Sequence, residues 1–474
     1  MDNLLYFIKP IADYIPYVEK PIKKLKPNEK LVWTGMVLFI YLIYSQIPLY
    51  GIYKTQEADP LHYMRVILAS SKNTLAELGI SPIIFSSYII GFLRTFHLIK
   101  FDPNIKEEKY LYNITVKFMA IILIFGQSIA FVFQGMYGPV NLIGPFKIFL
   151  LIAQLVIGGV IIIILDEILS NGYGLISGIS LFVSTNISEN LLMKCFSPFT
   201  LSSDKGVEYE GAIIALFHFL ITKRNIFEAL KLAFFRKSAP NLFQLIFTLI
   251  ILLLVIYLWK FKLELKIIRK TSPGELHSMK IKLFYTSTTP LIIMNFLFSH
   301  IYLVSLNLYL KYNNSFIIKL LGTWALKDGK HVPVNGLAYY LTPPKDPYEF
   351  IIQPFKNLVY VFIILYSSGK MIQLMCESTG KGAIDIAREF RKEGIFFSDI
   401  RENEEGVYER LKKIIPVVCF LSGMIISGIQ ILADVFRAFG SGTGLLIMVS
   451  NIITVQENID EEENKGNVKI FLEE

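Results

Sequence analysis

Long apolar runs alternate along the chain with shorter polar segments, and each run is close to the roughly 20 residues that cross a hydrocarbon core as a helix. The pattern predicts an all-α, polytopic membrane protein with about ten transmembrane helices. The runs are Leu31–Tyr50, Leu75–Ile99, Asn113–Phe133, Gly144–Leu165, Leu175–Met193, Asn241–Phe261, Thr289–Leu310, Pro354–Met375, Ile414–Phe436 and Gly442–Val455.

A shorter apolar piece, Leu61 to Ser71, precedes the second run. It is too short to cross a bilayer and too apolar for a water-exposed loop, so it needs a protein cavity. Directly after it, Pro82 stands near the start of the longer run, and Ile80 and Ile84 fall on one helical face. Because irregular backbone at membrane depth survives only against protein or water, the pattern predicts a re-entrant segment inside a channel.

The composition excludes a soluble domain for most of the chain. The 474 residues are 53% hydrophobic and 18% charged, with a mean hydropathy of +0.50. The formal net charge is +8, and Lys and Arg concentrate between the apolar runs, which fits loops that face anionic headgroups or a nucleic acid. No small-residue cleavage motif follows the first run, so we interpret it as a permanent span.

The distribution of charge also predicts the orientation. The basic, amphipathic N-terminus is expected in the cytosol, and an even number of spans places the C-terminus there too. The basic loops 260–282 and 370–413 then face the cytosol. The loop Lys194–Lys237 is also basic but falls on the opposite side, where long loops translocate largely regardless of charge.

The ten runs divide into five plus five, so two similar halves would form an inverted pair with a cavity between them. We expect two five-helix halves with this cavity between them. The predicted parts are a cytosolic N-terminus (1–30), an N-terminal half (31–193), an inter-half loop (194–240), a C-terminal half (241–457) and a cytosolic tail (458–474).

The chain carries no sequence signature of an enzyme, a metal site or a cofactor site. Cys195, Cys376 and Cys419 lie far apart, and the six histidines are scattered. The glycine-rich run Gly440–Gly444 follows no strand, so a tight turn is favoured over nucleotide binding. Without an ATP site, any work must come from a partner or a gradient.

Few ionisable residues fall within the runs. Capping or snorkelling explains those at run ends, namely Asp166, Glu167, Asp434 and Arg437. For Glu77, Glu189 and Arg94, roles in a cavity and at a helix end are equally open. Gln127 and His300 are polar residues within apolar runs, and they predict either helix-to-helix hydrogen bonds or the lining of a movable seam.

A set of short motifs runs in order through nearly the whole chain. They include Ala58-Asp-Pro60, Glu77-Leu-Gly-Ile-Ser-Pro82, Gly135-Met-Tyr-Gly138, Leu165-Asp-Glu167, Tyr209-Glu-Gly-Ala-Ile-Ile-Ala-Leu-Phe-His218 and Gly440-Ser-Gly-Thr-Gly444. With these motifs the chain resembles the large alpha subunit of the Sec protein-conducting channel, the SecY family, in its eukaryotic endoplasmic-reticulum form. Together the motifs are highly specific, although none would suffice alone.

The resemblance implies two pseudo-symmetric five-helix halves around a central hourglass pore. An aliphatic ring narrows this pore, and a plug at 59–73 closes its outer side. An apolar constriction excludes ions by dewetting yet makes no fixed hydrogen bonds, so varied peptides can slide through it. The implied ring residues are Ile80, Ile84, Ile179, Val183, Ile292 and Ile447. The implied plug residues are Asp59, Pro60, Leu61, Met64, Arg65, Val66, Ile67 and Leu68.

The resemblance also implies a lateral gate and a ribosome-docking surface. The gate lies between the second and third spans and the seventh and eighth, with Phe85, Gln127 and His300 at the seam. Basic side chains of the two cytosolic loops would meet ribosomal RNA phosphates. They are Arg269, Lys270, Lys280, Lys282, Arg401, Arg410, Lys412 and Lys413.

The implied function is a passive pore in the endoplasmic reticulum membrane that moves secretory chains across and releases membrane segments into lipid. Its implied partners are small single-span beta and gamma subunits, the ribosome, nascent chains with their signal sequences, membrane lipid and accessory post-translational translocation factors. The alternative is a secondary transporter with inverted repeats and a midplane solute site, which should show polar ligands at broken spans. An intramembrane enzyme lacks a paired catalytic constellation.

Overall fold

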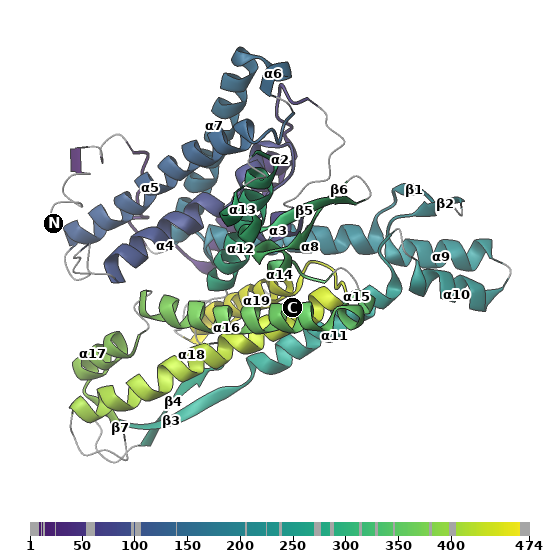
Figure 1. The fold of residues 1–474 in the computed structure, drawn as a ribbon. Helices are drawn as coiled ribbons and strands as arrows, with labels where there is room; N and C mark the ends of the chain where they lie inside the picture. The colour runs from purple at the N-terminus through teal and green to yellow at the C-terminus, as the bar shows by residue number, and fades with distance from the viewer. Residues whose placement is uncertain are drawn as a thin grey trace. The chain divides into compact units, whose positions relative to one another are not determined.

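A computed structural model describes most of the chain as a helical protein (Figure 1). The described residues are 9–10, 12, 15–23, 25–53, 62–95, 99, 106–138, 140–203, 206–223, 225–236, 239–269, 276–284, 289–311, 315–327, 330–344, 347–378, 382–397 and 404–464. Their contacts form two compact units. The first comprises Met1–Ile187 and Ser450–Glu474, and the second comprises Ser188–Val449.

The helices of the first half of the chain follow the predicted runs closely. They are α2 (Pro27–Gln46), α3 (His62–Ile67), the 3-10 helix η1 (Leu75–Leu78), α4 (Ser81–Thr95), α5 (Lys106–Phe133), α6 (Val140–Ile143), α7 (Pro145–Ile168), the π-helical turn η2 (Leu169–Tyr173) and α8 (Gly178–Phe196).

The second half continues with longer spans joined by short helices. They are α9 (Ala212–Thr222), α10 (Ile226–Phe235), α11 (Leu242–Trp259), α12 (Thr289–Lys311), α13 (Phe316–Leu321), α14 (Leu337–Leu341), α15 (Pro347–Ile352), α16 (Pro354–Ser378), α17 (Ala383–Glu393), α18 (Glu404–Val435) and α19 (Gly442–Asn464).

Seven helices among the described residues are long and apolar enough to cross a membrane. They correspond to the predicted runs two, three, four, six, seven, eight and nine. The other three runs are also helical, as α2, α8 and α19 with 20, 19 and 23 residues. The second run was predicted as one continuous helix but is interrupted: η1 ends at Leu78, Gly79 caps it, and α4 begins at Ser81.

Three small antiparallel sheets lie in the connections and were not predicted. One pairs β1 (Thr200–Ser203) with β2 (Gly206–Tyr209), and another pairs β5 (Thr323–Lys327) with β6 (Lys330–Asn335). The third has the order β4-β3-β7, from Leu276–Lys282, Lys262–Arg269 and Ile395–Phe397. It joins the two loops that the sequence predicts as cytosolic.

The N-terminal segment is held against the first unit by a buried cation. Lys117 of α5 forms an ion pair with Glu167 of α7 at 2.5 Å and donates a second hydrogen bond to the Pro16 carbonyl. Asn171 Nδ2 donates to the Val18 carbonyl at 2.6 Å. Burial raises the pKa of the neighbouring Tyr17 phenol above its ordinary value. The segment therefore ties α5 and α7 together at one end.

In the second unit, α16 and α18 cross with their backbones in close approach. A Cβ atom built on Gly423 would lie 2.7 Å from Gly369 Cα, so only glycine fits there. At the same crossing the Ser368 hydroxyl donates to Ser427 Oγ at 2.7 Å, and the Ser427 hydroxyl donates to the Gly423 carbonyl at 2.8 Å. Small residues and hydroxyl hydrogen bonds are the usual means by which helices associate within a membrane.

We expect Gly423→Ala to lower the midpoint of thermal unfolding, because overpacking at a rigid contact costs about 1–3 kcal/mol. Gly428→Ala in the same helix is the matched control. Its added methyl meets only Leu365 Cδ2 at 4.0 Å, so this variant should be as stable as the parent chain or more so. Thermal unfolding of the two purified variants in one detergent checks this. Equal midpoints would contradict the close crossing.

Candidate functional site

The predicted plug segment folds back into the first unit after one short helix. α3 ends at Ile67, and Leu68 and Ala69 form a turn in which Ala69 has φ 51°. Ile67, Leu68 and Ala69 are all buried, at 2%, 7% and 0% exposure. Asp59, Pro60 and Leu61 lie outside the described residues, as does the side chain of Met64.

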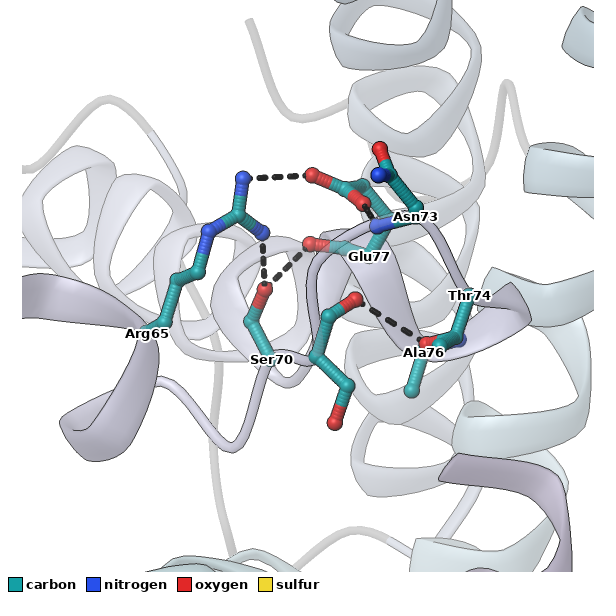
Figure 2. Close-up of polar contacts among 7 residues, drawn as sticks. Arg65, Ser70, Asn73, Thr74, Ala76 and Glu77 are labelled. Carbon is teal, nitrogen blue, oxygen red and sulfur yellow. Dashed lines mark hydrogen bonds and ion pairs between the residues drawn. The ribbon is translucent and has the colours of Figure 1, made fainter. Parts of the chain in front are cut away.

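A buried ion pair joins this segment to the start of the second span (Figure 2). The Arg65 guanidinium lies 2.6 Å from a carboxylate oxygen of Glu77, and both side chains are more than nine-tenths buried. Ser70 Oγ accepts a hydrogen bond from the same guanidinium at 3.0 Å and donates to the Glu77 carbonyl at 2.5 Å. The second carboxylate oxygen of Glu77 accepts a hydrogen bond from the backbone N–H of Asn73.

This network fixes the docked position of the segment and contributes little to the net stability of the fold. Desolvating two charges cancels much of their mutual attraction, so a buried pair contributes little net stability. Removing one partner is different, because it leaves the other charge buried without compensation, at a cost of about 3–5 kcal/mol. The Arg65 and Glu77 pair therefore favours one docked arrangement of the segment.

The backbone of the segment is also held by side chains from two other helices. Asn186 Nδ2 of α8 donates to the carbonyls of Arg65 at 3.1 Å and Val66 at 3.0 Å. The Tyr41 hydroxyl of α2 donates to the Ala69 carbonyl at 3.3 Å. The Ile80 amide donates to the Leu68 carbonyl at 3.0 Å, directly before α4. The irregular backbone thus finds the partners that a protein cavity must supply.

Gly79 permits this close approach. Its φ is +55°, and a Cβ atom there would lie 2.2 Å from the Leu68 carbonyl oxygen. Any other residue would displace the turn at Leu68, because the contact is with backbone. The glycine of the motif Glu77-Leu-Gly79 is explained by this contact.

Five of the six predicted ring residues are buried, at 0% for Ile80, 1% for Ile84 and Val183, 3% for Ile292 and 4% for Ile447, and Ile179 is half-buried. The first unit holds Ile80, Ile84, Ile179 and Val183, and the second holds Ile292 and Ile447. Asp166 Oδ1 accepts a hydrogen bond from the Ile179 amide at 2.9 Å, which fixes the start of α8. Of capping and snorkelling, the two explanations that the sequence left open for Asp166, this contact is of the capping kind. The ring itself stays a prediction.

Two of the predicted gate residues make hydrogen bonds of different kinds. In the first unit, Gln127 Oε1 of α5 accepts from the Ser81 hydroxyl of α4 at 3.2 Å, and Phe85 lies one turn further along α4. In the second unit, His300 Nδ1 bonds the Phe296 carbonyl of its own helix at 3.1 Å. Gln127 thus makes a hydrogen bond between helices, and His300 makes one within a helix.

The predicted docking residues lie on or beside the three-stranded sheet. Lys282 pairs with Lys262 at one end of β3 and β4, and Arg410 lies over the Phe397 ring at 5.1 Å. Lys412 and Lys413 follow on α18 and are exposed. Lys270 and Arg401 lie outside the described residues, as do the side chains of Arg269 and Lys280. The sheet brings strands from both basic loops together.

Within the described part of the chain, no group of three or more His, Cys, Asp or Glu side chains is placed to hold a metal ion. For Glu77 the sequence leaves a cavity role and a helix-end role equally open, and it does not single out Asn186, Tyr41 or Gly79. One signal for Glu77 was available, because a carboxylate in an apolar run is expensive unless a cation compensates it. The Asn186 contact joins positions more than a hundred residues apart, and no local pattern indicates it.

Comparisons with known proteins agree with the resemblance seen in the motifs. Residues 74–456 match the SecY family, and residues 39–72 match the family described as the plug domain of Sec61p. The protein transport protein SEC61 of Saccharomyces cerevisiae is 40% identical over 464 residues, 97% of this chain and 96% of that protein. The Sec61 subunit alpha of Dictyostelium discoideum is 36% identical and covers 98% of each chain.

Two solved structures share the fold. One, described as the structure of a protein conducting channel, aligns with a TM-score of 0.76 at 28% identity, covering 96% of this chain and 97% of that one. The other is Sec61 in the canine ribosome-channel complex from the endoplasmic reticulum, with a TM-score of 0.73, 28% identity and the same coverage. These matches confirm the predicted channel fold.

We expect Arg65→Gln to loosen the plug segment, because Glu77 would stay buried without its cation. Hydrogen–deuterium exchange of the closed channel should show the Ser70 and Ile80 amides exchanging roughly a hundredfold faster. Lys72→Gln removes an exposed cation of the same segment and is the matched control. Equal protection in both variants would reject the ion pair as the tie that holds the segment.

Proposed function

The chain belongs to the SecY family, and from this premise we propose that it is the pore-forming subunit of the protein-conducting channel of the endoplasmic reticulum membrane. It would let secretory polypeptides cross the membrane and release membrane segments sideways into lipid. The observation that carries the proposal is the docked plug segment, which packs against the start of α4 and matches the Sec61p plug domain.

The proposed pore works by exclusion of water and ions. In the closed state the aliphatic side chains of the ring form a constriction that dewets. An extended polypeptide parts them without breaking specific hydrogen bonds, so chains of many sequences can pass. The Ile80 amide donates to the Leu68 carbonyl of the plug turn, and Ile84 lies one helical turn further along α4, so movement of the plug would act directly on this side of the ring.

Lateral release follows from the hydrophobic effect. A segment that leaves an aqueous pore for lipid gains about 25 cal/mol for each Å² of apolar surface removed from water. We propose that the pair of α4 and α5 forms one side of the exit, with the Ser81 to Gln127 hydrogen bond holding these two helices together. The exit would then open where this pair meets the other side of the gate, and apolar contacts there would separate at little cost in lipid.

We propose the ribosome as the cytosolic partner. Relatives of this chain have been solved on ribosomes, namely canine Sec61 and the idle yeast Ssh1 complex on the yeast 80S ribosome. The exposed cations of α18 and the sheet β4-β3-β7 would contact RNA phosphates, which set position and make binding depend on salt. Small single-span beta and gamma subunits and accessory translocation factors would complete the complex.

The channel is proposed to be no enzyme, with force supplied by a translating ribosome or a pulling partner. A secondary transporter remains the second candidate by the inverted-repeat argument. The positions that would line its midplane site are the aliphatic ring residues, which offer neither charge nor hydrogen bonds to a solute. The aliphatic ring positions therefore favour the channel.

The pore ring is tested by ion conductance. Replacing Ile80 and Ile84 by Gly should raise the ion leak of channels reconstituted in planar bilayers, because the constriction loses the side chains that exclude water. Ser87→Gly, at an exposed position of the same helix, controls for the effect of glycine on α4. Conductance equal to that of the control would remove both isoleucines from the ring.

Ribosome docking is tested by charge reversal at exposed sites. Lys412→Glu with Lys413→Glu should weaken ribosome binding and reduce the slope of log affinity against log salt by about 0.7–0.9 for each lost phosphate contact. Lys311→Glu with Lys319→Glu makes the same charge change on the opposite predicted side. Cosedimentation at several salt concentrations measures both. Equal weakening in the two pairs would indicate a general charge effect and no docking site.

A further inference from the structure

The basic connection Lys194–Lys237 is the part of the chain that the proposed function does not use. Its described residues contain the β1–β2 pair and a helical hairpin, α9 and α10, of 11 and 10 residues (Figure 1). Large apolar side chains cover the outside of this hairpin at high exposure. They are Phe217 at 60%, Leu220 at 39%, Ile221 at 84%, Ile226 at 64%, Phe227 at 83%, Leu230 at 36% and Phe235 at 69%.

The opposite face of the hairpin is packed and fixed. Ala215 and Phe219 of α9 and Ala229 and Ala233 of α10 form one core cluster with Leu242 at the start of α11. Each helix of the hairpin therefore has two groups of apolar residues. One group packs against the protein, and the other is exposed on the outer face. Soluble surfaces rarely carry so dense an apolar patch.

A buried arginine locks the base of the hairpin. Arg236 donates to the carbonyls of Tyr209 at 2.7 Å, Glu210 at 2.6 Å and Pro240 at 2.5 Å. Asn241 then caps α11 by accepting from the Gln244 amide at 2.9 Å. Because the base is fixed to the first turn of a membrane span, the hairpin lies at one end of that span.

The outer apolar face is continuous with the surface of this span. The Phe235 ring lies 6.5 Å from Phe243 of α11, which lies 4.8 Å from Phe247. Beyond them α11 exposes Leu249, Ile250 and Leu253, at 53%, 50% and 68%. Those side chains belong to a helix apolar enough to cross the membrane, of which only 22% is buried in protein. We therefore expect lipid to contact the exposed apolar side chains of both α11 and the hairpin.

Two exposed lysines accompany the apolar side chains. Lys223 ends α9, and Lys231 stands four residues after Phe227 and four before Phe235 on the outer face of α10. A lysine among aromatic residues is typical of helices that lie in the membrane interface, where the stem packs with apolar groups and the ammonium reaches the headgroups. Such lysines add attraction to anionic lipid.

We propose that the α9–α10 hairpin lies in the plane of the bilayer interface and docks on anionic lipid, with Ile221, Phe227 and Phe235 below the headgroups and Lys231 at them. The assignment of the hairpin to the membrane side that faces away from the cytosol rests on the proposed function, and the rest of the proposal does not. The positive-inside rule disfavours a basic connection on this side of the membrane. The proposal explains its positive charge, because the lysines hold the hairpin to the bilayer and so fix the outer end of α11.

Depth measurements with a fluorescent probe test the proposal. Ile221→Cys and Phe227→Cys would each be labelled with an environment-sensitive dye in the full channel complex, since Cys195, Cys376 and Cys419 are buried. In phosphatidylcholine–phosphatidylserine vesicles, shallow doxyl lipids should quench both probes at a depth of about 5–10 Å below the headgroups, and aqueous iodide should not. Glu389→Cys on α17, exposed and polar, is the control.

Each outcome decides the matter. Iodide quenching equal to that of the Glu389 probe would overturn the proposal. A probe that iodide quenches in vesicles of purified channel but not in native microsomes would also overturn it, because a protein partner would then cover the hairpin. Lys231→Gln should shrink the emission shift between neutral and anionic vesicles, and an unchanged shift would reject the lysine contact. None of these readouts depends on ion conductance through the ring. Failure of the channel proposal would appear in the conductance measurements, and failure of the hairpin proposal in the quenching measurements.

Discussion

The irregular backbone of the plug segment is the constraint on which the first unit depends. At membrane depth an unpaired amide or carbonyl has no water to bind, so every turn outside a helix needs a partner from the protein. The carbonyls of Arg65, Val66, Leu68 and Ala69 all find one, from Asn186, from the Ile80 amide and from Tyr41. Three helices are therefore arranged around one short segment.

The nature of these contacts suits the movement that we propose for this segment. The hydrogen bonds to its backbone and the ion pair of Arg65 with Glu77 are directional, so they select one docked position, yet their net contribution to stability is small. Apolar burial alone is not directional, so a plug held only in that way could dock in several shifted positions. A plug held by many charged pairs would be costly to release. The observed combination gives a defined closed state that moderate forces can open.

The sequence predicted the helices well because membrane spans are defined by length and apolarity, both of which are local. The break between η1 and α4 was not predicted, because Leu75–Ile99 is a single apolar run and the positive φ of Gly79 depends on its contact with Leu68. The sheet β4-β3-β7 was missed although Lys262-Leu-Glu-Leu-Lys266 alternates polar and apolar residues, the period of a strand. The contact from Asn186 to the plug could not be predicted, because it depends on how distant helices pack.

The position of Asn186 has a mechanical consequence. It lies on α8 with Ile179 and Val183, at spacings of four and three residues that place all three on the same side of the helix. Any displacement of α8 that moves those two side chains also pulls on the two carbonyls that Asn186 holds. With Ile179 and Val183 in the ring that we propose, the ring could not widen while the plug stayed seated, and gating would approach an all-or-none event.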